Sequence, residues 1–216
     1  MLLTMPLSDI KGVGDKTADQ LKLAGLETVD DIIHFFPRSY EDFTAVTSIA
    51  DIRPGKVTVK ARVSHIATKY VRRGMQVTTA TLSDGSGSIK AVWFNQPYRE
   101  TQLKSSEPFL FSGDFTFSRG QYQLMTPSAE KASDITTSSD AIIPVYRAVK
   151  GLKSQIVRKI LEQLKPTIAT LDESLPKHVI EEENLVSRAQ AILKLHFPSS
   201  QQDIEQAKER LAFEEL

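Results

Sequence analysis

The 216-residue sequence has no cysteine, a single tryptophan and no long apolar segment. Without cysteine the chain forms no disulfide, and it offers neither a thiolate ligand for zinc nor a thiol nucleophile. Its apolar stretches are only a few residues long, so we expect no membrane-spanning helix. No basic segment precedes a long apolar run near Met1, so we also expect no secretory signal. These absences fit a cytoplasmic protein that buries an ordinary hydrophobic core.

Motifs for catalysis are missing as well. A phosphate-binding Walker loop needs Gly-x4-Gly-Lys-Ser/Thr, and Gly14-Asp15-Lys16-Thr17 matches only its end, with an aspartate where phosphates would be repelled. Gly85-x-Gly87 lies between two expected strands and opens no helix, so it is not a dinucleotide-binding fingerprint. The four histidines lack metal-ligand spacing, and no Gly-x-Ser-x-Gly nucleophile motif is present. We therefore expect no catalytic cluster, no metal and no cofactor in this chain.

Charge is distributed unevenly along the chain, although 27 basic and 27 acidic residues give a formal net charge of zero. Residues 1–51 and 172–216 each carry a net charge of −5, whereas residues 53–104 carry +8 and residues 105–171 carry +2. A basic middle between acidic ends is typical of a chain that binds a polyanion. Strands that use lysine and arginine on their solvent-exposed faces would give the same pattern, so charge alone leaves both interpretations open.

Both ends of the chain have helical periodicity. In residues 1–46 we expect a short helical turn, a helix over residues 16–24 that is capped by Asp15 and closed by Gly25, and a third helix capped by Thr28. Residues 148–216 have apolar stripes that end at Pro166 and Pro198, followed by a last helix capped by Ser199 or Ser200. Because the last stripe reaches residue 216 without glycine or proline, we expect a longer parent protein.

The middle of the chain, residues 50–147, alternates apolar and polar residues as half-buried strands do. Glycine-containing turns separate the expected strands at residues 72–74, 84–87 and 119–120. Five strands with a break after the third are typical of an OB-type β-barrel, although other small barrels share this layout. The sequence thus predicts an α+β protein, with a five-stranded OB-type barrel between N-terminal helices that resemble a helix-hairpin-helix and a C-terminal helical segment.

Gly12, Gly14 and Lys16 are the first candidate binding residues. In a helix-hairpin-helix, such glycines let backbone N–H groups at a helix N-terminus approach a DNA phosphate while a nearby lysine adds charge. A tight interhelical turn needs glycine for backbone reasons alone, and the surrounding segment is acidic. Phosphate binding is therefore one of two interpretations of this turn.

The expected barrel carries the other candidates. Lys69, Arg72 and Arg73 lie at the first hairpin, and Arg119 lies at the tip of the last. OB-type barrels bind oligonucleotides with such loops and with the adjoining sheet face. Phe94 ends the third strand, and Tyr98 and Arg99 follow just after Pro97. The two rings could stack on bases or could close the bottom of the barrel core.

Several short segments, taken in chain order, together resemble the N-terminal region of the bacterial RecG family of ATP-dependent DNA helicases. They are residues 10–14 (IKGVG), 36–42 (FPRSYED), 82–87 (LSDGSG), 93–98 (WFNQPY), 144–146 (PVY), 195–198 (LHFP) and 210–216 (RLAFEEL). The resemblance implies a wedge domain that holds a DNA branch point while separate motor domains pull the DNA. It also implies that Phe94 and Tyr98 stack where the strands part, and that residues 69–73 guide a separated strand.

The resemblance further implies which partners and cofactors the chain has. Its partners would be branched DNA and the motor domains of the same polypeptide, which would bind ATP and magnesium, and the protein would be a nucleoid-associated monomer in the bacterial cytoplasm. Two alternatives stay open: a general single-strand or RNA-binding barrel, and a protein-interaction scaffold whose acidic helices bind a partner. An enzyme acting alone is disfavoured because the sequence has no catalytic cluster.

Overall fold

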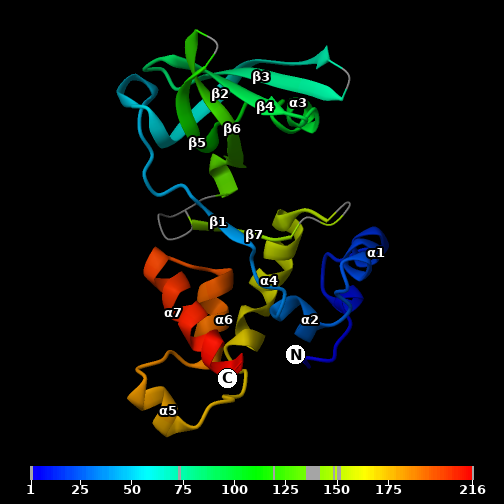
Figure 1. The fold of residues 1–216 in the computed structure, drawn as a ribbon. Helices are drawn as coiled ribbons and strands as arrows, with labels where there is room; N and C mark the ends of the chain where they lie inside the picture. The colour runs from blue at the N-terminus through cyan, green and yellow to red at the C-terminus, as the bar shows by residue number, and fades with distance from the viewer. Residues whose placement is uncertain are drawn as a thin grey trace. The chain divides into compact units, whose positions relative to one another are not determined.

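The computed structural model describes residues 2–72, 74–118, 120–134, 142–147, 149 and 152–215. The chain divides into two compact units (Figure 1), a helical unit made by residues 1–40 and 142–216 and a barrel unit made by residues 41–141. This division differs from the expected segments 1–46, 50–147 and 148–216. The physical reason is that the helical segments from the two ends of the chain bury their apolar stripes in one shared core.

The barrel unit is a five-stranded sheet that closes on itself in the order β2-β3-β4-β6-β5. Its strands are β2 (Gly55–Arg72), β3 (Met75–Ser83), β4 (Ser88–Phe94), β5 (Phe109–Ser118) and β6 (Gln121–Lys131). Neighbouring strands are antiparallel except β4 and β6, which are parallel. The five expected strands are thus present, and the helix α3 (Tyr98–Gln102) lies in the expected break after the third barrel strand.

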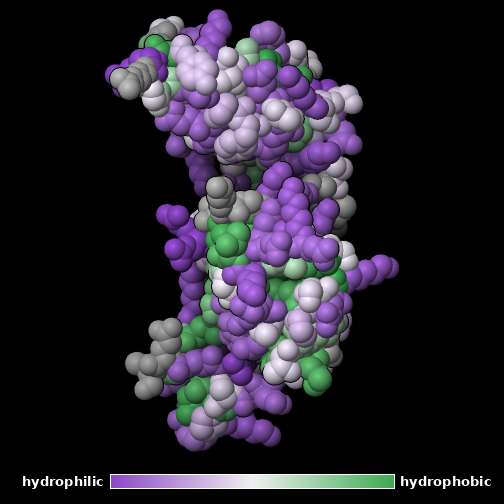
Figure 2. All heavy atoms as spheres, turned by 90° about the vertical axis from the view of Figure 1, so that its right-hand side faces the viewer, coloured by the Kyte–Doolittle hydropathy of each residue, from purple (hydrophilic) through white to green (hydrophobic). Residues whose placement is uncertain are grey.

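Alternation along the strands explains the barrel core. Ala91 and Trp93 lie on the same face of β4, and both side chains point inward and are fully buried. The indole Nε1 of Trp93 donates a hydrogen bond of 2.7 Å to the carbonyl oxygen of Pro127. This bond satisfies the one polar atom of the side chain and ties β4 to the neighbouring β6. Polar side chains in purple cover most of the barrel unit on the face drawn in Figure 2.

The helical unit contains helices from both ends of the chain. The elements are η1 (Leu7–Asp9), α1 (Asp15–Leu23), α2 (Val29–Ile33), α4 (Ser154–Ile168), α5 (Lys177–Glu182), α6 (Arg188–His196), α7 (Gln201–Ala212) and η5 (Phe213–Glu215). A two-stranded sheet joins β1 (Ser39–Asp42) to β7 (Ile142–Val145). Leu21 and Ile32 from the first segment pack in one core with Leu161 and Leu164 from the last, and all four are fully buried.

Several helix boundaries differ from expectation. Asp15 is the first residue of α1 and the N-cap is Gly14, so the Asp15 carboxylate favours the helix through its dipole instead of capping it. Pro166 lies inside α4, whose last turn is stabilised by the buried Thr167 and Ile168 beyond the proline. Thr28 caps α2 as expected, in a capping box with Asp31.

Candidate nucleic-acid interface

Strand register brings Lys69 and Phe94 to the same face of the barrel sheet. Lys69 of β2 lies opposite Val77 of β3, and Val77 lies opposite Phe94 of β4. Directly opposed residues share a face, and adjacent strands are about 4.8 Å apart, so Lys69 and Phe94 belong to one row about 10 Å wide. The structure therefore unites a basic and an aromatic residue that the sequence separates by 25 positions.

A sharp backbone turn follows Phe94. Asn95 has a positive φ of 53°, a left-handed conformation that asparagine tolerates better than most residues. Its backbone N–H donates to the carbonyl oxygen of Gln76 at 2.8 Å, and its side-chain oxygen accepts from the Gln76 N–H at 3.0 Å. These two bonds fix the point where the chain leaves the sheet, so Tyr98 begins the helix α3 just beyond the barrel edge.

Tyr98 and Arg99 form a rigid polar-aromatic group around Gln96. The Gln96 side-chain oxygen accepts hydrogen bonds from the Tyr98 hydroxyl at 2.9 Å and from Arg99 Nε at 3.0 Å. The Arg99 guanidinium lies 5.3 Å from the centre of the Tyr98 ring and 6.0 Å from that of Trp93. Tyr98 is nevertheless 56% exposed. The ring is thus positioned by its neighbours while much of its surface faces solvent.

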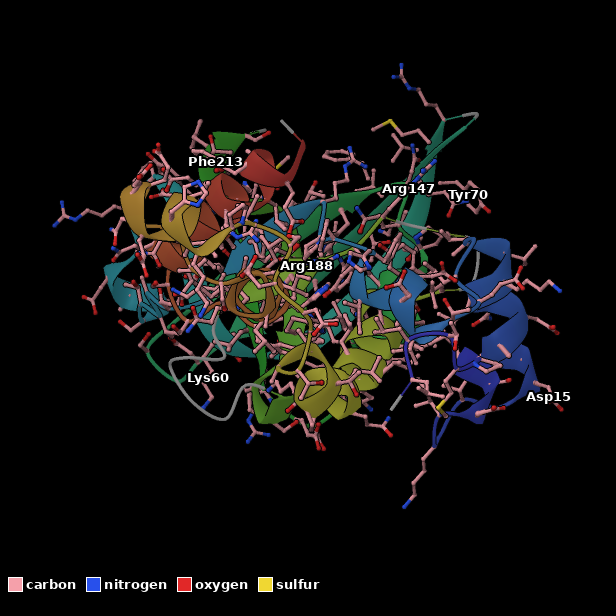
Figure 3. The ribbon with its side chains drawn as sticks, turned by 90° about the horizontal axis from the view of Figure 1, so that it is seen from below. Asp15, Lys60, Tyr70, Arg147, Arg188 and Phe213 are labelled. Carbon is pink, nitrogen blue, oxygen red and sulfur yellow. The ribbon has the colours of Figure 1, made fainter. Side chains whose placement is uncertain are left out.

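The β2–β3 hairpin extends as a basic and aromatic arm. Tyr70 is 80% exposed and projects from the hairpin (Figure 3), and Lys69 and Arg72 are also exposed. Arg72 lies opposite Met75 in the strand register, which places it at the end of the hairpin. Arg73 and the hairpin residue Arg119 lie outside the described residues. The described part of the arm offers cationic groups and a ring, which are the groups that bind nucleic-acid backbones and bases.

One acidic residue lies beside the arm. Hydrogen bonding from the Thr68 hydroxyl, together with the nearby Lys104, lowers the pKa of Glu100 in α3. Lys104 Nζ lies 3.5 Å from the Glu100 carboxylate. The acid thus joins α3 to β2, and its charge is balanced by a neighbouring cation.

The structure places the remaining candidates, Gly12, Gly14 and Lys16, in the helical unit. Gly12 has a φ of +88° and Gly14 is the N-cap of α1, so the turn needs Gly12 for its backbone geometry. The first element of the expected helix-hairpin-helix is only the three-residue turn η1. Lys16 is exposed.

Two further exposed rings escaped the sequence reasoning. Phe117 of β5 is 60% exposed and Tyr122 of β6 is 51% exposed, and their ring centres lie 5.2 Å apart. Their signal in the sequence is the spacing Phe115-x-Phe117 before a glycine turn and Tyr122 after it, which places three rings on one face of a hairpin.

Within the described residues, no group of three or more histidine, cysteine, aspartate or glutamate side chains could hold a metal ion. The described helices are also too short or too polar to cross a bilayer. The arrangement around Phe94 and Tyr98 combines cationic and aromatic groups, which can contact phosphates and stack on bases.

Several known proteins are similar to this chain. The family model described as the RecG wedge domain matches residues 6–168. Curated proteins named ATP-dependent DNA helicase RecG are 35% identical in Thermotoga maritima and 27% identical in Streptococcus pneumoniae, over 99% and 100% of this chain. The chain spans 28% and 32% of the length of these two relatives.

A solved structure supports the same relationship. The structure of RecG bound to a three-way DNA junction matches with a TM-score of 0.69 and 33% sequence identity, covering 100% of this chain and 30% of the other. The match of the family model extends over more than half of the chain and includes both Phe94 and Tyr98. The chain therefore belongs to the RecG wedge-domain family.

Proposed function

We propose that this chain binds branched DNA and separates the strands at the branch point, as the wedge region of an ATP-dependent DNA helicase. The observation that carries the proposal is the pair Phe94 and Tyr98 at the edge of the barrel, with Arg99 between Tyr98 and the barrel core. Stacking on an aromatic side chain stabilises an unpaired base by about 1–3 kcal/mol, so the pair compensates for part of the stacking that is lost at the split.

The barrel itself blocks the path of the duplex DNA. The closed order β2-β3-β4-β6-β5 supports its interpretation as an OB-type barrel, a fold that binds oligonucleotides with its hairpins and sheet face. Its width prevents it from passing between paired strands, so duplex DNA pulled against it must open. Lys69 and Arg72, together with Arg73 and Arg119, would contact phosphates of the separated strands.

The comparisons support the same role. The relatives are named as ATP-dependent DNA helicases, and the similar solved structure is of RecG bound to a three-way DNA junction. We assign ATP hydrolysis, with its magnesium ion, to motor domains in the two thirds of the relatives that this chain does not span. The proposal places a monomeric protein in the bacterial cytoplasm, at the nucleoid.

The test is a binding titration of this chain with forked, single-stranded and duplex DNA over a series of salt concentrations. We expect the fork to bind most tightly, with affinity falling as salt rises. Tyr98→Ala should weaken fork binding by about 5-fold to 150-fold, whereas Tyr98→Phe should retain most of it because the ring remains. Since Tyr98 is 56% exposed, neither substitution should change the unfolding transition much.

A charge variant and its matched control complete the experiment. Lys69→Gln should weaken binding to every DNA and reduce the salt slope by about one unit, whereas Lys22→Gln on the acidic helical unit should change neither. Equal affinity for fork and plain single strand would contradict the proposal and favour a general single-strand or RNA-binding barrel. Absence of binding at low salt would instead favour a protein-interaction scaffold.

A further inference from the structure

The β5–β6 hairpin carries a cluster of three aromatic rings. Tyr122 stacks on Phe115 with ring centres 5.3 Å apart, and Phe117 meets Tyr122 edge to face at 5.2 Å. Phe115 belongs to the barrel core and is only 8% exposed. Tyr122 is thus held in place by a buried ring, and Phe117 is held by Tyr122.

Phe117 and Tyr122 are more exposed than side chains that only fill the barrel core. Phe115 already contributes to the core, whereas Phe117 and Tyr122 are 60% and 51% exposed. Among the phenylalanine, tyrosine and tryptophan side chains in the described part of the barrel unit, the only other exposed ones are Tyr70 and Tyr98, both in the site described above. A rigid pair of exposed rings offers π-faces at low entropic cost, which is the property of a base-stacking platform.

The sheet links this hairpin to the branch-point site. Lys90 lies four residues before Phe94 on β4, about 13 Å along the strand, and pairs with Gln123, the neighbour of Tyr122 on β6. Lys90 is exposed and shares a cross-strand row with His65 through Thr81. The β2–β3 and β5–β6 hairpins extend from the barrel in different directions (Figure 1). Lys90 therefore shares a face of β4 with Phe94, whereas Tyr122, which directly precedes Gln123, lies on the opposite face of the sheet.

We propose that Phe117 and Tyr122 form a second stacking site, which binds bases of one DNA strand after it has separated at Phe94 and Tyr98. The inference rests on the proposed function and extends it. The ligand is single-stranded because bases in a duplex present only their edges, whereas these rings need a free base face. The two aromatic sites are separated along β4 by about 13 Å or more. An unpaired arm of a few nucleotides is therefore needed to reach from Phe94 to the second site.

The test uses a series of DNA forks with unpaired arms of increasing length, in which only one strand is lengthened at a time. Each fork is titrated with this chain. Affinity should rise once one arm is long enough to reach the hairpin. The double variant Phe117→Ala/Tyr122→Ala should lose that rise, with about 5-fold to 150-fold weaker binding of the long-armed fork. Its affinity for a fork without arms should match that of the unsubstituted chain. A fluorescent adenine analogue placed in the arm should be quenched on binding only when both rings are present.

Phe117→Leu is the control for folding, because leucine preserves apolar packing in the hairpin but removes the π-face. It should keep the unfolding transition and still lose the arm-length dependence. The inference is overturned if the double variant keeps that dependence, as it would if the rings bound a protein, or if it loses affinity equally for the fork without arms. If the unsubstituted chain shows no preference for forks over duplex DNA, the proposed function itself fails, and this inference fails with it.

Discussion

His196 makes the stability of the helical unit depend on pH. Its ring is 1% exposed and lies between the Tyr146 hydroxyl, 2.8 Å from Nδ1, and the Ile33 carbonyl oxygen, 2.8 Å from Nε2. A carbonyl oxygen only accepts hydrogen bonds, so Nε2 carries the proton and Nδ1 accepts from Tyr146. Burial is the main cause that lowers the pKa of His196 from 6.5 to about 4.

The sign and size of the effect follow from this shift. Above pH 6.5 the imidazole is neutral in both folded and unfolded chains, and its full contribution to stability is present. As the pH falls from 6.5 towards about 4, the unfolded chain takes up a proton that the folded chain does not bind, and the unfolding free energy decreases. At 1.36 kcal/mol per pKa unit, the total loss is about 3 kcal/mol.

The assay is denaturant unfolding followed by far-ultraviolet circular dichroism over this pH range, for the unsubstituted chain and for His196→Gln. A glutamine amide can donate to Ile33 and accept from Tyr146 without titrating. We expect the variant to be less stable at neutral pH, with a difference that shrinks as the pH falls. Trp93, the only tryptophan of the chain, lies in the barrel core and provides a separate fluorescence signal for that unit.

Parallel loss of stability in the two proteins would refute this reasoning. It would mean that His196 binds a proton equally well in the folded and unfolded chains, and that acid acts through other groups. In the difference between the unsubstituted chain and His196→Gln, the contribution of those groups to the unfolding free energy cancels, because both proteins contain the same carboxylates.

Three further predictions concern stability and are measured by denaturant unfolding. Gly113→Ala should cost about 2 kcal/mol, because the added Cβ would lie 2.9 Å from the Cα of Pro127. Gly14→Ser should be nearly neutral, because the added Cβ has open space and serine is a good N-cap residue for α1. Equal stabilities of the two variants would contradict this. Trp93→Phe should cost about 2 kcal/mol by leaving the Pro127 carbonyl unpaired, and an unchanged transition would show that the bond contributes nothing. Burial raises the pKa of Asp84, but hydrogen bonds from Ser86, Ile49 and Gly87 outweigh it and lower the pKa to about 2. Asp84→Asn should therefore destabilise the barrel more at neutral pH than below about pH 2, and a pH-independent difference would contradict that.

Local signals in the sequence determined much of the fold. Period-two alternation predicts barrel strands in the middle of the chain, and β4 (Ser88–Phe94) is one of them. Thr28 and Ser200 cap helices as expected, because an N-cap depends on atoms only three residues away. The glycine turns between strands also lie where the sequence predicts them, since positive φ is a property of single residues. The segments that resemble RecG were likewise readable in the sequence.

Only the tertiary structure decided how distant segments combine. Helices of the two chain ends share one core because each amphipathic stripe is too small to be buried alone, and no local pattern identifies its partner. The same holds for the candidate interface, where strand register places Lys69 in one row with Phe94, and a hydrogen-bond pair between Asn95 and Gln76 directs the chain to Tyr98. The sequence by itself determined which residue types and turns were present, because these depend on neighbours along the chain. The three-dimensional fold decided which of them meet, because register and packing depend on residues far apart in it.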